Sequence, residues 1–536
     1  MKKLIKYLIL IASGGLTALS MMYTPLCFLA WFSIAPLAYY LFKETDRKKN
    51  PFRIYLTMLV WALSFYIVIF HWFVYMYPMD FLGLDKDQAV WMVAFFWFGL
   101  SGVQAACTAI AAPLFRLCAR HRFLYAPLFA SLYVLFEWFQ TLFWTGVPWA
   151  RLAISQTPAT VFIQSASLFG SLFVSFIIVL VNALIAFAFV YFTEKGIRDR
   201  GVRIYAIAAA GVFLANLLFG CAALAFHTED EERRFTAVLV QGNLASAEKW
   251  NSDISPLELY TDLTLKAIEE AGGKADIIVW PETSINYYLK QSKRTVEGIS
   301  KLASDTGAVI LVGTFDAEED EEGNFFEYNA VIAFMPDGSM EETPYYKQHL
   351  VPFGEYVPMR ELVFKTMPWL DDLNLFGSDL TPGSEPRPAV TDLGRIGRLV
   401  CFDSIYSDLA RVSVGNGAEL LSLSTNDSWF RDSTAVYQHN RHAVLRSVEN
   451  GRWMLRAANT GISTIISSTG AVTKSLDPLV TGYVIGDAYF SSSRTLYSYI
   501  GDLFVLTCFM FAATEGVFVI VGKVRSRKTN EKENNP

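Results

Sequence analysis

The sequence predicts a helical membrane bundle, then a water-facing α/β domain, then a last membrane helix. Of the 536 residues, 53% are hydrophobic and 18% are charged, whereas soluble domains carry roughly 25% charged residues. Long apolar stretches are concentrated before residue 227, and the segment 227–499 instead holds 23 Lys/Arg and 39 Asp/Glu. This composition excludes a purely soluble enzyme and a disordered chain. It also excludes a nucleic-acid binder, which would need a basic balance.

Eight segments have the length and apolarity of a membrane-spanning helix, which needs roughly 20 mostly apolar residues. The first follows Lys2, Lys3 and Lys6, so a cleaved signal peptide is the alternative for that segment. A second apolar segment follows almost at once, which favours a retained helix. The expected spans are 4–20, 25–42, 54–77, 89–115, 123–144, 166–193, 202–226 and 500–522.

Positive charge predicts the orientation of these spans, because cytoplasmic loops are enriched in Lys and Arg. With the N-terminus inside, the inside loops before residue 227 hold fifteen Lys/Arg, and the outside loops hold only Lys86 and Arg151. The acidic segment is therefore expected on the outer side of the cytoplasmic (inner) membrane of a multi-pass protein. The expected domains are 1–226 (seven spans), 227–499 (outer domain), 500–522 (eighth span) and 523–536 (basic cytoplasmic tail).

Two ionisable residues, His71 and Glu137, fall inside expected spans. An ionisable group within the membrane is a functional candidate by default. No chain of such groups runs through the spans, so a proton-coupled transporter is poorly supported. A buried hydrogen bond or an interfacial position is the favoured interpretation of both residues.

The outer segment alternates short apolar runs with amphipathic stretches, which is typical of a layered α/β domain. In Ser255–Ala271, the apolar residues Leu259, Leu263 and Ala267 are four apart, as on one face of a helix. Thr295–Ser304 is a second expected helix. The expected strands are Arg234–Gln241, Asp276–Trp280, Ala308–Gly313, Asn329–Met335, Arg398–Phe402 and Leu420–Ser424.

Cys401 is the only cysteine of the outer segment, so it cannot form a disulfide within that domain. A solitary thiol in an oxidising compartment is a candidate reactive group, although an inert buried cysteine is the alternative. Cys401 ends an expected strand just before an expected helix, whose positive end would favour the thiolate. No C-x-x-C pair is present and no histidine stands at metal-ligand spacing from it, so no metal is expected.

A cysteine nucleophile needs a base and a group that stabilises the developing oxyanion. Glu282 follows the expected strand 276–280 in Trp-Pro-Glu, where Pro281 ends the ladder. Lys347 stands in YYKQHLVPFGE, between a strand and a loop. Strand ends of α/β sheets are where functional groups gather. The two residues are therefore candidate partners of Cys401.

These motifs in this order resemble the nitrilase superfamily, with its Glu-Lys-Cys triad. With seven spans before the outer domain and one after it, nearly the whole chain resembles the apolipoprotein N-acyltransferase family. Further matching pieces are Val240–Asn243, Thr425–Phe430 and Ala458–Ser463. The resemblance implies a nitrilase-like α-β-β-α sandwich for the outer domain.

The resemblance also implies roles for individual residues. Glu282 would be the general base, Lys347 would stabilise the oxyanion, and Cys401 would be the nucleophile. Glu355 matches a further glutamate near the family's active site, and Trp250 matches a tryptophan near the substrate entrance. No metal or cofactor is implied.

One dipeptide departs from the family pattern. The family's catalytic cysteine is commonly followed by Tyr-Glu, whereas Phe402 and Asp403 stand here. Phe402 keeps the ring without the hydroxyl, and Asp403 keeps the charge on a shorter side chain. Two alternatives remain open for Asp403: it supports the turn that carries Cys401, or it contacts substrate directly.

The implied reaction is a two-step acyl transfer. An acyl chain would move from a phospholipid, usually phosphatidylethanolamine, to a thioester on Cys401, and then to the N-terminal amine of the S-diacylglyceryl cysteine of an apolipoprotein. The alternatives are a membrane-tethered nitrilase-type amidase and a non-catalytic membrane protein that binds or senses. The apolar loops 353–359 and 363–376 are either lids over the acyl chains or loops buried against the protein.

Overall fold

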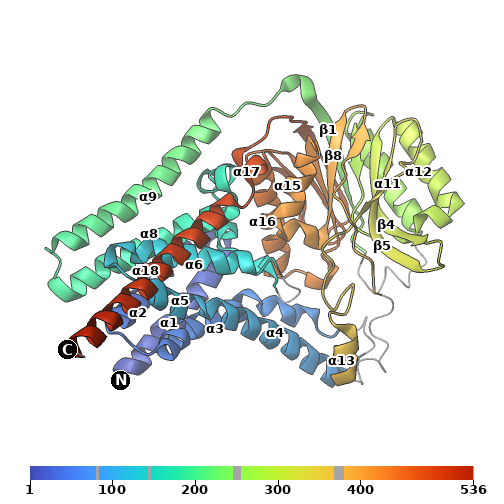
Figure 1. Ribbon diagram of the computed structural model, residues 1–536. Helices are drawn as coiled ribbons and strands as arrows, with labels where there is room; N and C mark the ends of the chain where they lie inside the picture. The colour runs from blue at the N-terminus through green and yellow to red at the C-terminus, as the bar shows by residue number, and fades with distance from the viewer. Residues whose placement is uncertain (80–83, 143–145, 245–254, 367–378, 535–536) are drawn as a thin grey trace. The chain divides into compact units, whose positions relative to one another are not determined.

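The computed structural model describes residues 1–79, 84–142, 146–244, 255–366 and 379–534 (Figure 1). These residues form two compact units. The first comprises Met1–His71, Ala94–Ala225 and Ile500–Pro536, and the second comprises Trp72–Val93 and Phe226–Tyr499. The membrane-side segment Trp72–Val93 therefore belongs by its contacts to the second unit, where the Trp72 ring meets the Phe430 ring edge-on at 5.0 Å. The sequence does not predict this association.

The first unit is helical throughout. Its apolar helices carry few charges, as expected of segments that cross a bilayer. The main helices, counting α4 whose first turns group with the second unit, are α1 (Lys2–Met22), α2 (Ala35–Asp46), α3 (Pro51–Ile69), α4 (Lys86–Ala109), α5 (Ala111–Cys118), α6 (Tyr125–Phe139), α8 (Ser171–Lys195), α9 (Arg200–Ala225) and α18 (Leu503–Asn534).

Seven helical segments of the described residues are long and apolar enough to cross a membrane. They correspond to seven of the eight expected spans. The remaining one, 123–144, contains α6, whose 15 residues are shorter than the roughly 20 that a span needs. α18 continues to Asn534, so helical structure extends into the expected tail 523–536.

Buried polar contacts hold α1 against its neighbours. Lys6 Nζ donates to Glu44 Oε1 at 2.8 Å and to Thr57 Oγ1 at 2.6 Å. Trp61 Nε1 donates to Ser13 Oγ at 3.1 Å. These bonds tie α1 to α2 and α3. Such partners make the first helix an integral part of the unit.

Buried Glu137 accepts a hydrogen bond from the Leu152 amide at 2.8 Å. His71 Nδ1 lies 3.2 Å from the Val68 carbonyl oxygen. Both contacts agree with the interpretation of these residues as local hydrogen-bonding groups.

The second unit is a sandwich of two sheets. The first sheet has the order β13-β1-β2-β4-β5-β6, with β3 paired to β4, and the second has the order β12-β11-β10-β9-β8-β7. Strands β1, β2 and β4 are mutually parallel, and so are β8, β9 and β10. The strands are β1 (Arg234–Gln241), β2 (Ile277–Val279), β3 (Ile285–Tyr288), β4 (Val309–Glu319), β5 (Phe325–Phe334), β6 (Tyr345–Tyr346), β7 (Ala389–Thr391), β8 (Gly394–Val400), β9 (Leu420–Thr425), β10 (Met454–Ala458), β11 (Ser463–Ile466), β12 (Val472–Leu476) and β13 (Gly482–Tyr489).

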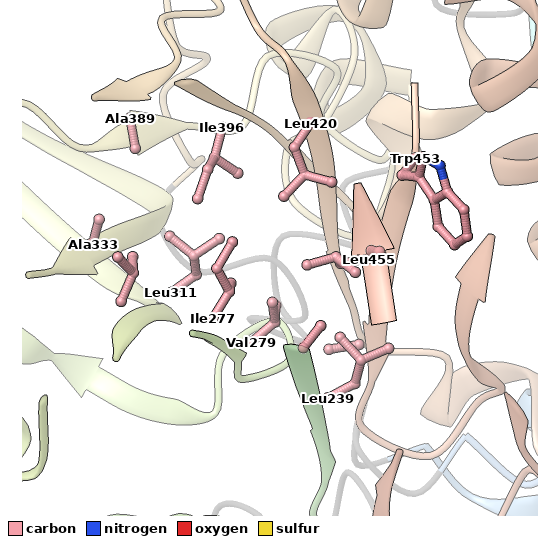
Figure 2. Close-up of a cluster of buried hydrophobic side chains, with 14 of the residues drawn as sticks. Leu239, Ile277, Val279, Leu311, Ala333, Ala389, Ile396, Leu420, Trp453 and Leu455 are labelled. Carbon is pink, nitrogen blue, oxygen red and sulfur yellow. The ribbon is translucent and has the colours of Figure 1, made fainter. Parts of the chain in front are cut away.

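Apolar side chains from both sheets fill the space between them (Figure 2). Leu239, Val279 and Leu311 come from the first sheet, and Leu420 and Leu455 from the second; all are fully buried. Because successive side chains of a strand point to opposite faces, the alternate residues Val238, Ile278 and Ile310 lie in another core, on the outer face of the first sheet.

Helices cover the outer faces of both sheets (Figure 1). α11 (Pro256–Glu270) and α12 (Lys293–Thr306) supply Leu263 and Ile299 to the core outside the first sheet. α15 (Ser407–Gly415) and α16 (Thr434–Asn450) pack on the second sheet. The α-β-β-α sandwich that the resemblance implied is therefore confirmed.

A pair of adjacent glycines in α1 allows a test of this packing. A Cβ on Gly14 would lie 2.4 Å from the Trp61 carbonyl oxygen of α3, whereas the nearest atom to a Cβ on Gly15 would be 3.8 Å away. We expect Gly14→Ala to lower the melting temperature in detergent, since overpacking costs about 1–3 kcal/mol. Gly15→Ala is the matched control and should melt as the wild type does. Equal melting of the two variants would contradict the close packing of α1.

Candidate active site

Cys401 lies on a strained turn directly after β8. It is the first residue of the 3-10 helix η10 (Cys401–Ile405) and has a φ of +46°. Thr283, which follows Glu282, has a φ of +48°. A residue other than glycine held in this region costs about 1–3 kcal/mol, and such positions cluster at functional sites.

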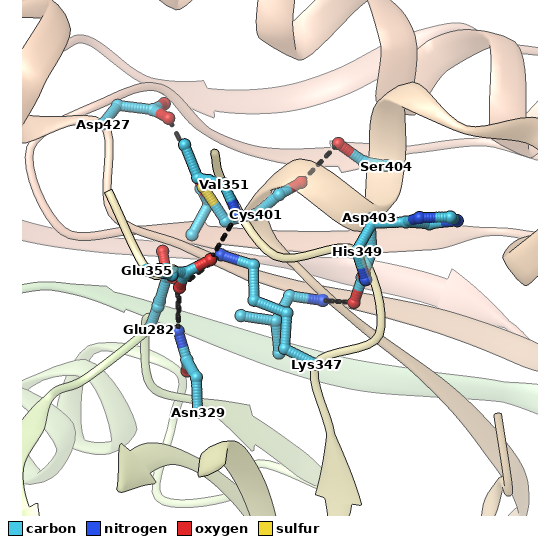
Figure 3. A network of polar contacts seen from close by, with 12 residues as sticks. Glu282, Asn329, Lys347, His349, Val351, Glu355, Cys401, Asp403, Ser404 and Asp427 are labelled. Carbon is cyan, nitrogen blue, oxygen red and sulfur yellow. Dashed lines mark hydrogen bonds and ion pairs between the residues drawn. The ribbon is translucent and has the colours of Figure 1, made fainter. Parts of the chain in front are cut away.

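The other two candidate residues come from the first sheet. Glu282 follows β2, and Lys347 follows β6, where its amide donates to the Asn329 carbonyl oxygen of β5 at 2.8 Å. Figure 3 shows the side chains of Glu282, Lys347 and Glu355 gathered beside Cys401. Glu282, Lys347, Glu355 and Cys401 come from motifs that lie far apart in the sequence. The structure brings these four residues together.

The Lys347 ammonium is the centre of this cluster and is 1% exposed. It donates to Glu282 Oε1 at 3.2 Å and to Glu355 Oε1 at 2.8 Å. Asn329 Nδ2 donates to the same two oxygens, at 2.8 and 3.0 Å. The Val351 amide donates to the other oxygen of Glu355 at 2.8 Å. Each carboxylate is therefore fixed by at least two donors.

The electrostatics of the cluster fix the resting protonation states. Burial lowers the pKa of Lys347, but the nearby carboxylates of Glu282 and Glu355 outweigh it and raise that pKa well above its ordinary value. Burial, reinforced by the charge of Glu282, raises the pKa of the Cys401 thiol. The thiol is therefore neutral at rest, and the expectation that a helix end would favour the thiolate is wrong. The helix there is a single short 3-10 turn, and desolvation outweighs it.

Comparisons with known proteins agree with this geometry. Residues 239–496 match the carbon-nitrogen hydrolase family model, and residues 13–184 match the N-terminal domain model of apolipoprotein N-acyltransferase. Apolipoprotein N-acyltransferase of Geobacter metallireducens is 32% identical over 95% of this chain and 94% of its own length. The chain belongs to the apolipoprotein N-acyltransferase family.

Other relatives give the same result. The apolipoprotein N-acyltransferase of Brucella melitensis is 31% identical over 77% of this chain and 76% of its own length. That of Gloeobacter violaceus is 29% identical over 93% and 91%. Among solved structures, Saccharomyces cerevisiae Nit3 of the nitrilase superfamily covers 50% of this chain and 93% of its own, with 18% identity and a TM-score of 0.37.

Asp403 links the cysteine turn to the lysine loop in this family member. Its Oδ2 accepts from the Val400 amide at 3.0 Å and from the Tyr345 hydroxyl at 2.8 Å. Its Oδ1 accepts from the Gln348 and His349 amides at 3.3 and 2.8 Å. The side chain is fully buried, and burial raises its pKa. This geometry favours a supporting role over a direct substrate contact.

Phe402 takes part in a small aromatic cluster rather than in hydrogen bonding. Its ring meets the Tyr406 ring edge-on at 5.6 Å. The Tyr406 ring in turn stacks on His349 at 3.8 Å. Of the other expected features, Trp250 and part of the loop 363–376 lie outside the described residues. Helix α13 (Arg360–Thr366) occupies the start of that loop.

A buried ionic network supports Cys401 from the second sheet. Asp427 accepts a hydrogen bond from Arg456 Nη2 at 2.7 Å and lies 2.8 Å from His439 Nδ1. His439 Nε2 lies 3.1 Å from the Cys401 carbonyl oxygen and 3.0 Å from Ser404 Oγ. The network therefore holds the backbone of the strained turn.

The same network contains a geometric candidate for a metal centre. Donor atoms of Cys401, Asp427 and His439 lie within 4.8 Å of one another. Burial raises the pKa of Asp427, but Arg456 and His439 outweigh it and lower that pKa below its ordinary value. Because the Arg456 cation already compensates the carboxylate, the cluster fits a hydrogen-bonded support better than a metal site.

Asn329, His439 and Arg456 are site residues that sequence reasoning missed. Asn329 lies within the expected strand Asn329–Met335, and Arg456 lies in the middle of β10. One signal was present: α16 buries many polar residues, among them Gln438, His439 and Arg446. A helix with a polar buried face indicates a buried network, although it does not reveal the partners.

The hydrogen bonds of Asp403 allow a test of its role. Each carboxylate oxygen of Asp403 accepts hydrogen bonds from two donors. In Asp403→Asn, the side-chain NH2 group would replace one of these oxygens and face one pair of donors without being able to accept from them. We expect the variant to lose both thermal stability and acyl transfer, since an unsatisfied buried group costs about 1–3 kcal/mol. Asp262→Asn, on the exposed face of α11, is the control and should change neither quantity. Loss of acyl transfer with unchanged melting would instead indicate a direct substrate contact.

Proposed function

We propose that the chain transfers a fatty acyl group from a phospholipid, through a thioester on Cys401, to the N-terminal amine of a diacylated apolipoprotein. The observation that carries this proposal is the cluster of Glu282, Lys347 and Cys401 in a chain with membrane-spanning helices. The full-length similarity to apolipoprotein N-acyltransferases supports it. The acyl donor is proposed to be phosphatidylethanolamine.

The first step forms the thioester. Because the Cys401 thiol is neutral at rest, it needs a base at the moment of attack. Glu282 takes the thiol proton as sulfur adds to the ester carbonyl of the phospholipid. Collapse of the tetrahedral intermediate breaks the ester C–O bond, and the leaving alkoxide takes up that proton to give a lysophospholipid.

Lys347 stabilises the oxyanion of that intermediate. An ammonium has three N–H donors, and among the described residues two point to Glu282 and Glu355. The third is therefore available to the substrate oxygen. A pre-positioned donor of this kind contributes about 10²–10³ in rate.

The second step transfers the acyl group to the acceptor. The free α-amine of the S-diacylglyceryl cysteine attacks the thioester carbonyl, and Glu282 accepts the amine proton. An amide bond forms, the C–S bond breaks, and the thiol is regenerated with that proton. Both substrates carry lipid chains, and moving an acyl chain into water costs about 0.8 kcal/mol per methylene. A catalytic unit on a membrane-spanning chain avoids this cost.

The thioester intermediate provides the decisive experiment. We expect the protein purified from membranes to carry a fatty-acyl adduct on Cys401, detected by intact mass and removed by hydroxylamine. Cys401→Ser should lose the adduct and the N-acylation of a diacylated lipopeptide, since a hydroxyl is much harder to ionise.

Cys107→Ser and Cys221→Ser are matched controls that should retain both. N-acylation by the Cys401→Ser protein would refute the mechanism. Release of free fatty acid without transfer to the lipopeptide would instead indicate an amidase-like hydrolase.

We further propose that the second unit faces the outside of the inner membrane, on the basis of the charge distribution of the loops. Lys293 has a side chain that is 89% exposed. We expect Lys293→Cys to react with a membrane-impermeant thiol reagent in intact spheroplasts. Arg47→Cys, on an expected cytoplasmic loop, should react only after lysis. The reverse pattern would contradict this orientation.

A further inference from the structure

A pocket rich in arginine lies at the amino ends of the parallel strands in the second sheet. The candidate active site lies at the other, carboxyl ends of these strands. Its volume is about 290 Å³, and Arg395, Arg452 and Arg494 line it together with Glu419. Arg395 is the second residue of β8, Glu419 directly precedes β9, and Arg452 lies two residues before β10. The pocket therefore lies at the N-terminal ends of three parallel strands.

The two sites are well separated along those strands. Cys401 follows the last residue of β8, six residues after Arg395, and a strand rises about 3.3 Å per residue. About 20 Å of strand thus lies between them. The pocket is not part of the acyl-transfer site, and the proposed function does not use it.

The charges around the pocket do not balance. Glu419 is the one acidic residue that lines it, and its Oε1 accepts from Arg233 at 2.8 Å while its Oε2 accepts from the Arg395 amide at 3.0 Å. Its charge is therefore compensated by Arg233, which lies outside the pocket lining. Three guanidinium groups remain in a domain segment whose net charge is −16.

None of these three guanidinium groups has a carboxylate within ion-pair distance among the described residues. Arg452 is 2% exposed and donates to the carbonyl oxygens of Ala418 and Gly451, at 2.8 and 3.0 Å. Arg494 donates to the Ser498 carbonyl oxygen and lies over the Tyr499 ring at 4.2 Å. Burial lowers the pKa of Arg452 to about 10; the nearby charge of Glu419 opposes this shift, and the cations Arg494 and Arg233 add to it. Positive charge is therefore in excess here, since the single carboxylate of Glu419 faces three guanidinium groups of the pocket and that of Arg233.

Guanidinium groups converging on a small pocket match the geometry of a phosphate, which they bind through paired N–H donors. The adjacent chain has the character of a membrane interface. Leu496 and Tyr499 are 44% and 64% exposed, and Arg494 precedes α18 by nine residues. Exposed aromatic and apolar residues beside a cation are typical of the bilayer–water boundary.

We propose that the pocket formed by Arg395, Arg452 and Arg494 binds a phosphate group, supplied by the headgroup of an anionic phospholipid or by free phosphate. Arg395 and Arg494 bind the phosphate oxygens from the accessible side, and buried Arg452 supplies charge from below. Such binding offsets the repulsion among the three cations.

The test uses the full chain in neutral detergent with three probes. These are dihexanoyl-phosphatidylglycerol, dihexanoyl-phosphatidylcholine as the zwitterionic control with the same tails, and inorganic phosphate. Isothermal titration should show tighter binding of the phosphatidylglycerol than of the phosphatidylcholine. Binding of the phosphatidylglycerol alone assigns the phosphate to a lipid, and binding of inorganic phosphate assigns it to the free ion.

Matched variants connect the binding to the pocket. Arg395→Gln and the double variant Arg395→Gln/Arg494→Gln should weaken binding roughly 10- to 100-fold for each charge-assisted hydrogen bond lost. Arg387→Gln, which removes a 63% exposed arginine outside the pocket, should bind as the wild type does. Arg395 is exposed, so the single variant tests the pocket even where the double variant melts early. Absence of anion binding by the wild type, or unchanged binding by folded Arg395→Gln, would overturn the proposal.

Discussion

Lys347 lies between the carboxylates of Glu282 and Glu355 with its ammonium almost fully buried. A buried charge is tolerated only when partners compensate its lost hydration, which costs several kcal/mol per ion. Both carboxylates depend on this ammonium in turn, because they would otherwise face each other across the Asn329 amide. The ends of β2 and β6 and the loop at Val351 are thus tied to a single group. Removal of Lys347 would leave two carboxylates without a compensating cation in the centre of the site.

This arrangement also determines how the nucleophile works. Burial, reinforced by the charge of Glu282 and opposed by that of Lys347, raises the pKa of Cys401 and so disfavours a preformed thiolate. A neutral thiol resists unproductive oxidation better than a thiolate does. In the proposed mechanism it becomes a nucleophile only when an ester carbonyl is in place to accept the sulfur while Glu282 accepts the proton. Asp403 accepts hydrogen bonds from both the Cys401 turn and the loop after Lys347, and so fixes these two segments relative to each other.

Sequence reasoning predicted the site where chemistry coincided with a strand end. Glu282 and Cys401 each follow an apolar run and stand in short motifs, so their positions along the chain were informative. Asn329 and His439 carry no such mark, since each becomes part of the site only through the pairing of β5 with β6 or the packing of α16 on the cysteine turn. The expectation that a helix end favours the Cys401 thiolate did not allow for burial, because burial is a tertiary property that spacing along the chain does not report.

The fold, too, could be predicted only where it depends on local sequence. The lengths of the apolar runs predicted most of the membrane helices, and the bounds expected for β1 match those in the structure. Both features can be read from a short stretch of sequence, because they are local. The association of Trp72–Val93 with the catalytic unit is not local, since it rests on contacts such as that of Trp72 with Phe430. The arginines at 395, 452 and 494 are likewise scattered along the chain. Arg395 and Arg452 come together because β8 and β10 run parallel, and Arg494 joins them from the segment between β13 and α17. Parallel strands place all their carboxyl ends at one edge and all their amino ends at the other. The second sheet therefore carries two separate groups of polar residues, with the candidate nucleophile Cys401 at the carboxyl ends of its parallel strands and the arginine pocket at their amino ends.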